Sequence, residues 1–322
     1  MKPLAQMATP LRLVMDDGSR VVTTDAWAMF VASRTGDINH VRALASACPA
    51  LVACQYDYTV PLHLAVLGGH ARVVEFLLAE GGIDPAYKTH PYMDPLPLAA
   101  AERGFAEVAA MLDAAIADPA RHRNWLETGK IDHELDDAEL AFQRAVDESR
   151  HADVAAMLRQ RPALATNPFI FWGEGVLSMP AKDGDFEMCE LLMANGARVP
   201  DLSKWGKEYY LKRADGAAFL LDRGMNPNHM TWRGVTLLHD MAFTGQIEKA
   251  ALLLDHGAAV DAIDDEYCST PLGLAARWGR AEMVAFLLER GADRDQAAAP
   301  WATPLAWART KGHSAIVEML ER

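Results

Sequence analysis

Three aspartates and a set of aromatic side chains are the residues of this sequence whose types can do chemistry. A buried carboxylic acid with a raised pKa can donate a proton, and the acids to test are Asp183, Asp185 and Asp240. Stacked aromatic faces stabilise cations. If the chain is an enzyme, these groups together could support an acid-triggered cyclisation or isomerisation of an apolar substrate.

The usual catalytic and cofactor signatures are missing from the sequence. It contains no GxSxG elbow, no HExxH zinc helix, no Walker loop and no EF-hand. The histidines show no spacing typical of metal ligands, so we expect neither a metal nor a cofactor. An enzyme is therefore the second hypothesis for this chain, and a binding protein is the first.

Composition and charge narrow the class of partner. The 322 residues are 51% hydrophobic, which is enough for a large core. The net charge of -13 argues against nucleic acid as a partner, because a nucleic-acid binder needs a basic stripe and the sequence has no cluster of Lys and Arg. The same charge disfavours docking on an anionic membrane surface. Basic or cationic partners are favoured.

The sequence also bears on the compartment. It contains no run of eighteen apolar residues, and its first residues lack the apolar stretch of a signal peptide. Four cysteines are scattered without a CxxC pair, which is typical of a reducing compartment. We therefore expect a cytoplasmic protein with free thiols and no membrane insertion.

Self-comparison of the sequence shows an internal repeat. Residues 269–276 and 302–308 align, with Pro271 and Pro304 standing 33 residues apart, and residues 60–65 and 236–242 carry the same pattern. A glycine follows nine residues after the Thr-equivalent position of each copy, at Gly69, Gly245, Gly279 and Gly312. A second apolar run and a closing glycine complete each copy.

This pattern resembles the ankyrin repeat, a helix–turn–helix unit with the signature Thr-Pro-Leu-His-x-Ala. Thr caps the first helix, Pro occupies its first turn, and the glycine in the middle of the repeat allows a tight turn between two antiparallel helices. His63 and His239 stand at the family's histidine position, whose side chain normally bonds to neighbouring backbone. With weaker copies between the clear ones, the resemblance covers residues 27 to 322.

The predicted fold is therefore an all-α ankyrin-repeat solenoid of about nine units. Residues 11–24 alternate apolar and polar side chains around a turn at residues 16–19, which indicates a β-hairpin that caps the array. The expected domains are a cap (1–26), a first stack of about three repeats (27–112), a helical insertion or linker (113–139), and a second stack of about six repeats (140–322), in which the sixth repeat overall is irregular.

The resemblance also implies a binding surface. Partners of ankyrin proteins usually touch the hairpin tips and the residues just before the mid-repeat glycine. Those positions hold many of the chain's aromatic residues, although aromatics are only 8% of the total. Exposed aromatic side chains are costly unless they meet a partner. The expected partner-binding residues are Tyr56, Phe171, Trp172, Glu174, Tyr210, Trp232, Phe243, Tyr267, Arg277 and Trp278. Asp57 and Trp205 fall at or near the same positions.

Two functions from different classes remain open. The first is a scaffold that recognises a protein segment through an aromatic groove edged by acids, which would suit an apolar segment carrying basic residues. The second is a small-molecule site or enzyme acting on an apolar substrate. The shape of the groove separates them, since a scaffold leaves it open and an enzyme must close it. Association of two copies into a homodimer is also left open.

Overall fold

The computed structural model describes residues 1–3, 5–15, 18–56, 58–123, 130–131, 134–200 and 206–322. Asp57 and Trp205, named above as partner-facing, and residues 16–17 of the predicted turn lie outside these ranges. The chain divides into two compact units, Met1–Asp132 and His133–Arg322. The boundary falls within the predicted 113–139 segment. One α-helix ends inside this segment at Ala117, and the next α-helix begins inside it at Asp137. Each unit is described by itself.

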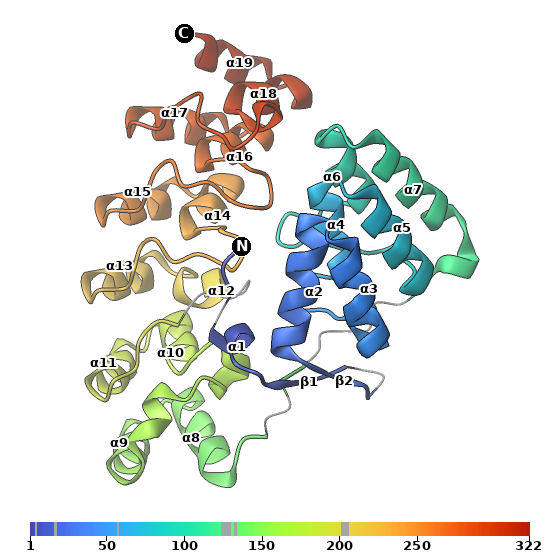
Figure 1. Cartoon of the computed structure of the whole chain (residues 1–322). Helices are drawn as coiled ribbons and strands as arrows, with labels where there is room; N and C mark the ends of the chain where they lie inside the picture. Colours follow the sequence, from blue (N-terminus) through green and yellow to red (C-terminus); the bar gives the residue numbers. More distant parts are fainter. Residues whose placement is uncertain (4, 16–17, 57, 124–129, 132–133, 201–205) are drawn as a thin grey trace. The chain divides into compact units, whose positions relative to one another are not determined.

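The first unit contains three helix pairs after a short N-terminal helix and two strands (Figure 1). The pairs are α2 (Thr23–Thr35) with α3 (Ile38–Ala47), α4 (Pro61–Gly68) with α5 (Ala71–Glu80), and α6 (Leu96–Glu102) with α7 (Ala106–Ala117). The remaining elements are α1 (Ala5–Ala8), β1 (Arg12–Val14), β2 (Arg20–Val22), η1 (Pro49–Ala53), η2 (Pro119–Arg121) and β3 (Lys130–Ile131).

The predicted N-terminal hairpin is confirmed as the antiparallel pair β1 and β2, in which Leu13 faces Val21. A third strand was not predicted. β3 pairs antiparallel with β1 on its other side, placing Ile131 opposite Leu13 and giving the strand order β2-β1-β3. A strand of two residues shows no alternation of apolar and polar side chains, so its sequence carries no signal for a strand.

The second unit contains six helix pairs stacked one after another (Figure 1). The pairs are α8 (Asp137–Asp147) with α9 (His151–Gln160), α10 (Ser178–Asp183) with α11 (Phe186–Ala194), α12 (Gly206–Tyr210) with α13 (Ala214–Asp222), α14 (Leu237–Thr244) with α15 (Ile247–Asp255), α16 (Pro271–Arg277) with α17 (Ala281–Glu289), and α18 (Pro304–Lys311) with α19 (Ser314–Glu321). Three short 3₁₀ helices lie in the loops: η3 (Pro162–Thr166), η4 (Ile170–Gly173) and η5 (Pro300–Ala302). The described ranges thus hold nine pairs in the two units together.

The sequence signals of the repeat act as expected at the helix ends. The side chains of Thr236, Thr270 and Thr303 each accept a hydrogen bond from the backbone N–H three residues ahead, which caps the first helix of the pair. The residue between the paired helices has a left-handed backbone in eight of the nine pairs, with φ between 52° and 82°. Glycine occupies seven of these positions and Ser149 the eighth, because this conformation is costly for a residue with a Cβ atom.

The two histidines at the family position differ in their partners. His239 accepts the N–H of Thr236 at Nδ1 and donates from Nε2 to the carbonyl of Ser269, 3.1 Å away. His63 instead lies 3.0 Å from the hydroxyl of Tyr87, and that hydroxyl donates to the carbonyl of Tyr58. Both imidazoles are completely buried and connect one hairpin loop to the next.

Candidate functional site

Arg277 lies at the centre of an aromatic cluster at the end of α16. Its guanidinium carbon is 4.0 Å from the ring centre of Trp278, 4.4 Å from that of Tyr267 and 5.0 Å from that of Trp307. Only 4% of Arg277 is exposed. A cation over aromatic faces is stabilised most strongly where water is excluded, so this arginine holds three ring systems from two repeats and their loop in place.

The predicted aromatic residues separate into buried and accessible groups. Tyr210, Trp232 and Tyr267 are each 1% exposed, and they pack inside the hairpin loops and helix ends. The hydroxyl of Tyr210 donates to the carbonyl of Glu174. Burial and the neighbouring Glu174 carboxylate raise the pKa of Tyr210 well above its ordinary value. These rings fill the interior of the unit, as does Phe171, and Glu174 is buried with them.

Two predicted rings remain partly accessible at the ends of the first helices. Phe243 lies at the end of α14 and Trp278 follows α16, and both are half-buried. Their ring centres lie 4.7 Å apart with planes at 74°, an edge-to-face contact that joins two consecutive repeats. The structure therefore brings together Phe243, Tyr267, Arg277 and Trp278, four of the residues that the sequence placed on one surface.

Trp172 is the most exposed large hydrophobic side chain among the described residues, at 82%. It sits at the tip of η4, where it and Phe171 have left-handed backbone angles with φ of 59° and 49°. Phe171 anchors this tip: its side chain is buried, and its N–H donates to the Oε1 atom of Gln143 over 2.9 Å. The tip is consequently held in a strained conformation that presents the indole to solvent.

The three candidate acids lie in different environments. Asp183 is exposed at the end of α10. Asp240 forms an ion pair of 3.2 Å with Lys207, and both side chains are mostly buried. Asp185 caps α11 and bonds to His151 over 2.9 Å. Although burial raises the pKa of Asp185, hydrogen bonds from His151, Met188 and Ser149 outweigh it and leave that pKa below the ordinary value. A carboxyl group with a lowered pKa is ionised at neutral pH and has no proton to donate, which is the opposite of what an acid catalyst needs.

Tyr56 belongs to the first unit, whereas the other predicted partner-binding residues belong to the second. Tyr56 is buried, and its backbone pairs with Thr59 across the hairpin loop before α4.

No group of three or more His, Cys, Asp and Glu side chains suited to a metal ion occurs in the part of the chain that the structure describes. None of the helices in that part is both long and apolar enough to span a membrane.

The hairpin tips carry residues that the sequence reasoning missed. The residue two positions before each first helix's N-cap has a left-handed backbone at Gly175 and Gly234, and also at Tyr58, Met93 and Cys268, where φ is 56°, 62° and 54°. Met93 is 55% exposed. The sequence contains a signal for these tips, namely a large residue at a position that favours glycine. Such a residue costs about 1 to 2 kcal/mol in a left-handed backbone, and this cost indicates that the tip has a role other than stability.

Lys207 is a second residue that sequence reasoning missed, and it neutralises Asp240. Its helix α12 has five residues and no repeat signature, so nothing in the sequence indicated the register that brings the amine to α14. The acidic edge predicted for the groove is thereby reduced on this side, because the Asp240 charge is compensated and Glu174 is buried.

Comparisons with known proteins match this architecture. A family model described as ankyrin repeats in three copies matches residues 177–298, and a model of the single ankyrin repeat matches residues 57–90. An ankyrin repeat and KH domain-containing protein of Caenorhabditis briggsae is 27% identical over 164 residues, which is 49% of this chain and 6% of that protein. The ARF GTPase-activating protein Git of Drosophila melanogaster is 35% identical over 83 residues, 26% of this chain and 11% of that protein.

The chain therefore spans only a small part of the length of these curated relatives. Among solved structures, the crystal structure of an ankyrin repeat domain from Acinetobacter baumannii matches with a TM-score of 0.48 and 22% identity, covering 57% of this chain and 97% of that one. The family models match each unit separately, and the helix pairs carry the caps and turns of the repeat. The chain is an ankyrin-repeat protein, and ankyrin repeats are a scaffold for protein–protein interaction.

Proposed function

We propose that this protein is a scaffold whose second unit binds a protein partner, with Trp172 as the anchor residue. The observation that carries the proposal is the indole of Trp172, 82% exposed on a tip whose backbone is strained. Interface residues that dominate binding are enriched in tryptophan, and a backbone that is already fixed loses little entropy when a partner binds. Exposing this indole costs free energy unless a partner buries it.

The local structure fixes the backbone of the tip that carries the indole. Two consecutive non-glycine residues, Phe171 and Trp172, have left-handed angles, at a cost of about 1 to 2 kcal/mol each. The buried Phe171 ring and its hydrogen bond to Gln143 hold that conformation. The side chain of Trp172 itself contributes nothing evident to the core. The tip is therefore built at the expense of stability, as is common at binding sites.

The half-buried pair of Phe243 and Trp278 supplies a second contact region in the same unit. It lies at the ends of α14 and α16, on the first helices of the repeats, where partners of repeat proteins bind. The net charge of -13 and the exposed carboxylate of Asp183 favour a partner segment that is apolar and carries basic residues. The proposed partner is therefore a protein segment of that composition.

The test compares partners retained by the full chain and by two variants. Trp172→Ala removes the proposed anchor, and Met230→Ala is the matched control, since Met230 is a large hydrophobic residue, 43% exposed, in the loop before α14. Quantitative affinity purification should retain a set of proteins on the wild type and on Met230→Ala that Trp172→Ala loses. Circular dichroism and thermal unfolding of Trp172→Ala should match the wild type.

A partner identified in this way is then titrated in solution. Trp172→Ala is expected to weaken binding by at least about 2 kcal/mol, the loss typical of a dominant interface residue, and Trp278→Ala by less. Equal affinity of Trp172→Ala and wild type for every retained protein would refute the role of Trp172. The same titration at raised salt checks the charge component, which should weaken as salt screens the acidic surface.

A further inference from the structure

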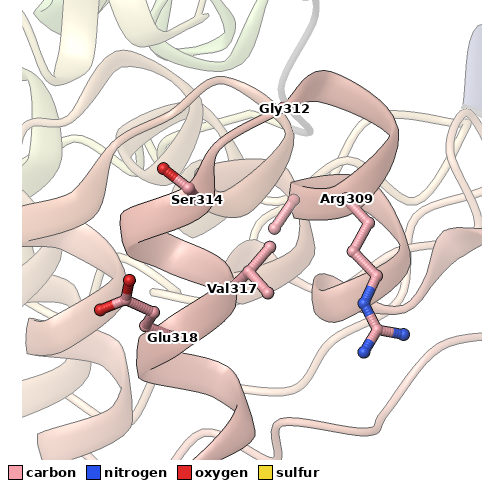
Figure 2. Close-up of a pocket in the computed structure, with 6 residues that line it drawn as sticks. Arg309, Gly312, Ser314, Val317 and Glu318 are labelled. Carbon is pink, nitrogen blue, oxygen red and sulfur yellow. The ribbon is translucent and has the colours of Figure 1, made fainter.

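The last repeat of the second unit carries an open pocket between α18 and α19. Its volume is about 430 Å³, and it is lined by Ala308, Arg309, Gly312, Ser314, Val317 and Glu318. Figure 2 shows Ser314, Val317 and Glu318 along one helix, Arg309 on the neighbouring helix, and Gly312 in the turn that joins them. The question is which chemical group this pocket fits.

The equivalent positions of other repeats show which side chains cover a turn glycine. Within each unit, the turn glycine of a helix pair that another pair follows is covered by the residue directly before the second helix of the next pair. Gly104, in the last pair of the first unit, is not covered in this way. A Cβ atom on Gly36 would lie 2.4 Å from the His70 ring, and one on Gly279 would lie 2.8 Å from the His313 ring. Phe105 covers Gly69 in the same way. Arg213 covers Gly184 with its guanidinium, whose Nε and Cζ atoms would lie 3.2 and 3.3 Å from a Cβ there. Arg280 lies over Gly245 with Cδ at 3.4 Å and Nε at 3.9 Å from such a Cβ. The group that fits over the turn is therefore planar, either a ring or a guanidinium.

Three of these planar groups also make the same hydrogen bond. His70 lies 3.0 Å from the carbonyl of Arg34, His313 lies 3.1 Å from that of Arg277, and Arg280 donates to that of Phe243 over 3.0 Å. Each carbonyl stands two residues before the covered turn glycine. A planar side chain with an N–H donor, placed where a helix begins, is thus the recurrent occupant of this position.

At the last repeat the same position is open. Apart from Gly312 and its immediate chain neighbours, no heavy atom of the described residues lies within 4 Å of a Cβ built on Gly312. The carbonyl equivalent to that of Arg277 belongs to Thr310. Val317 stands where the internal repeat has the buried Val284, so the floor of the pocket keeps its apolar character. The pocket therefore keeps the parts that receive a planar donor in the internal repeats.

The rim of the pocket differs from the internal repeats in one respect. Arg309 and Glu321 stand at the positions that Ala276 and Leu288 occupy in the preceding repeat, and they form an ion pair of 2.6 Å. Glu318 adds a further carboxylate at the edge. These charged groups leave the turn at Gly312 accessible. Glu321 is paired with Arg309, and Glu318 lies 4.0 Å from Arg322, so the rim offers carboxylate oxygens without a net negative charge.

We propose that the pocket at Gly312 is a docking site for a histidine or arginine that begins a helix of a partner protein. The side chain covers the turn glycine, donates its N–H to the carbonyl of Thr310, and lies beside Val317 with Glu318 near its charge. This surface is in the ninth helix pair, whereas Trp172 precedes the fifth. The two proposals are independent, and either can fail without the other.

The probe is a peptide that reproduces residues 312–322 of this chain, since that segment covers the equivalent turn at Gly279. An i,i+4 lactam bridge on its outer face keeps it helical. It is titrated into the full, isotopically labelled protein, and backbone amide shifts are followed by NMR. We expect shifts confined to α18, α19 and the turn at Gly312, and a weaker effect from the His313→Ala version of the peptide.

Two variants of the protein provide the matched comparison. Ser314→Trp fills the pocket from its rim, and Ala315→Trp places the same bulk on the next residue of α19, which does not line the pocket. Ser314→Trp should weaken peptide binding by at least about ten-fold, and Ala315→Trp should leave it unchanged. Absence of shifts at Gly312, equal binding by both variants, or equal binding of the His313→Ala peptide would overturn the proposal.

Discussion

The indole nitrogen of Trp307 donates a hydrogen bond to the hydroxyl of Ser269, 2.7 Å away, although the two residues are 38 positions apart in the chain. The hydroxyl of Ser269 in turn donates to the carbonyl of Ala302 over 2.7 Å. Ser269 and Trp307 are both buried. One serine in a hairpin loop thus connects the eighth and ninth helix pairs, and its removal would leave a buried indole N–H without an acceptor.

Ser269→Ala is expected to destabilise the second unit by about 1 to 3 kcal/mol, the usual cost of an unsatisfied buried donor. Urea unfolding followed by far-UV circular dichroism measures the change. The pair Ser269→Ala with Trp307→Phe tests the mechanism, since the Phe ring has no N–H to leave unsatisfied. Strictly additive losses in the double variant would contradict the coupling.

The buried pair of Asp264 and His239 should shape the pH dependence of stability. The Nε2 atom of His239 and the Oδ2 atom of Asp264 are 3.8 Å apart. Burial raises the pKa of Asp264 from 3.8 to about 7, despite N–H donors from Tyr267 and Ser269, and burial lowers the pKa of His239 from 6.5 to about 4. The contribution of protonated Asp264 is complete below pH 3.8 and is lost as pH rises towards 7. The contribution of neutral His239 is complete above pH 6.5 and is lost as pH falls towards 4.

The two slopes therefore oppose each other over the same pH range, and Asp264→Asn should expose that of His239. We expect the free energy of unfolding of Asp264→Asn to rise between pH 4 and pH 6.5, by at most about 1.4 kcal/mol for each step of one in pH. His239→Gln should show the reverse, a fall as pH rises. Urea midpoints across this range measure both, and parallel curves for the three proteins would contradict the prediction.

Met93→Gly is expected to stabilise the first unit. Met93 has φ of 62° and is 55% exposed, so glycine relieves the left-handed backbone while little buried area is lost. Glycine also gives the unfolded chain more conformational entropy, which offsets part of this gain. The net increase in the free energy of unfolding should be about 0.5 to 1 kcal/mol. Met230→Gly is the control, because Met230 is also exposed but has an ordinary backbone angle, and it should bring no gain. Thermal unfolding midpoints of the two variants measure the change, and an equal or lower midpoint for Met93→Gly than for the wild type would contradict the prediction.

Arg277→Lys should destabilise the second unit by about 2 kcal/mol, because the broad guanidinium contacts three rings at once and a compact ammonium cannot replace all of these contacts. The near-UV circular dichroism of the aromatic cluster should change with it. Arg223→Lys is the matched control: its guanidinium carbon is 3.7 Å from the Phe219 ring centre but its side chain is 38% exposed. There the loss should be about 0.5 to 1 kcal/mol. Equal losses at the two sites would show that burial of Arg277 adds nothing.

The repeat architecture was predictable because its signals are local. Thr270 and Pro271 begin a helix through groups within one turn, and Gly279 ends the turn through its own backbone angle. Such signals recur every 33 residues or so and need no knowledge of distant contacts. The N-terminal hairpin was predictable for the same reason, whereas β3 depends on pairing with β1 across the whole first unit.

For the candidate site, the sequence predicts where each residue lies within its repeat, but not whether its side chain is buried or exposed. The sequence places Tyr267 and Trp172 alike near hairpin tips, but Tyr267 is packed against Arg277 and Trp307, while Trp172 stands in solvent. Their different exposure depends on which side chains pack at that tip, such as Trp307, which is 40 positions after Tyr267 (307 minus 267) and belongs to the next repeat. Sequence alone thus determined the repeat, its caps and its turns. Only the tertiary structure decided which rings are core and which are surface, because burial is a property of the packed neighbours and not of the residue's own position.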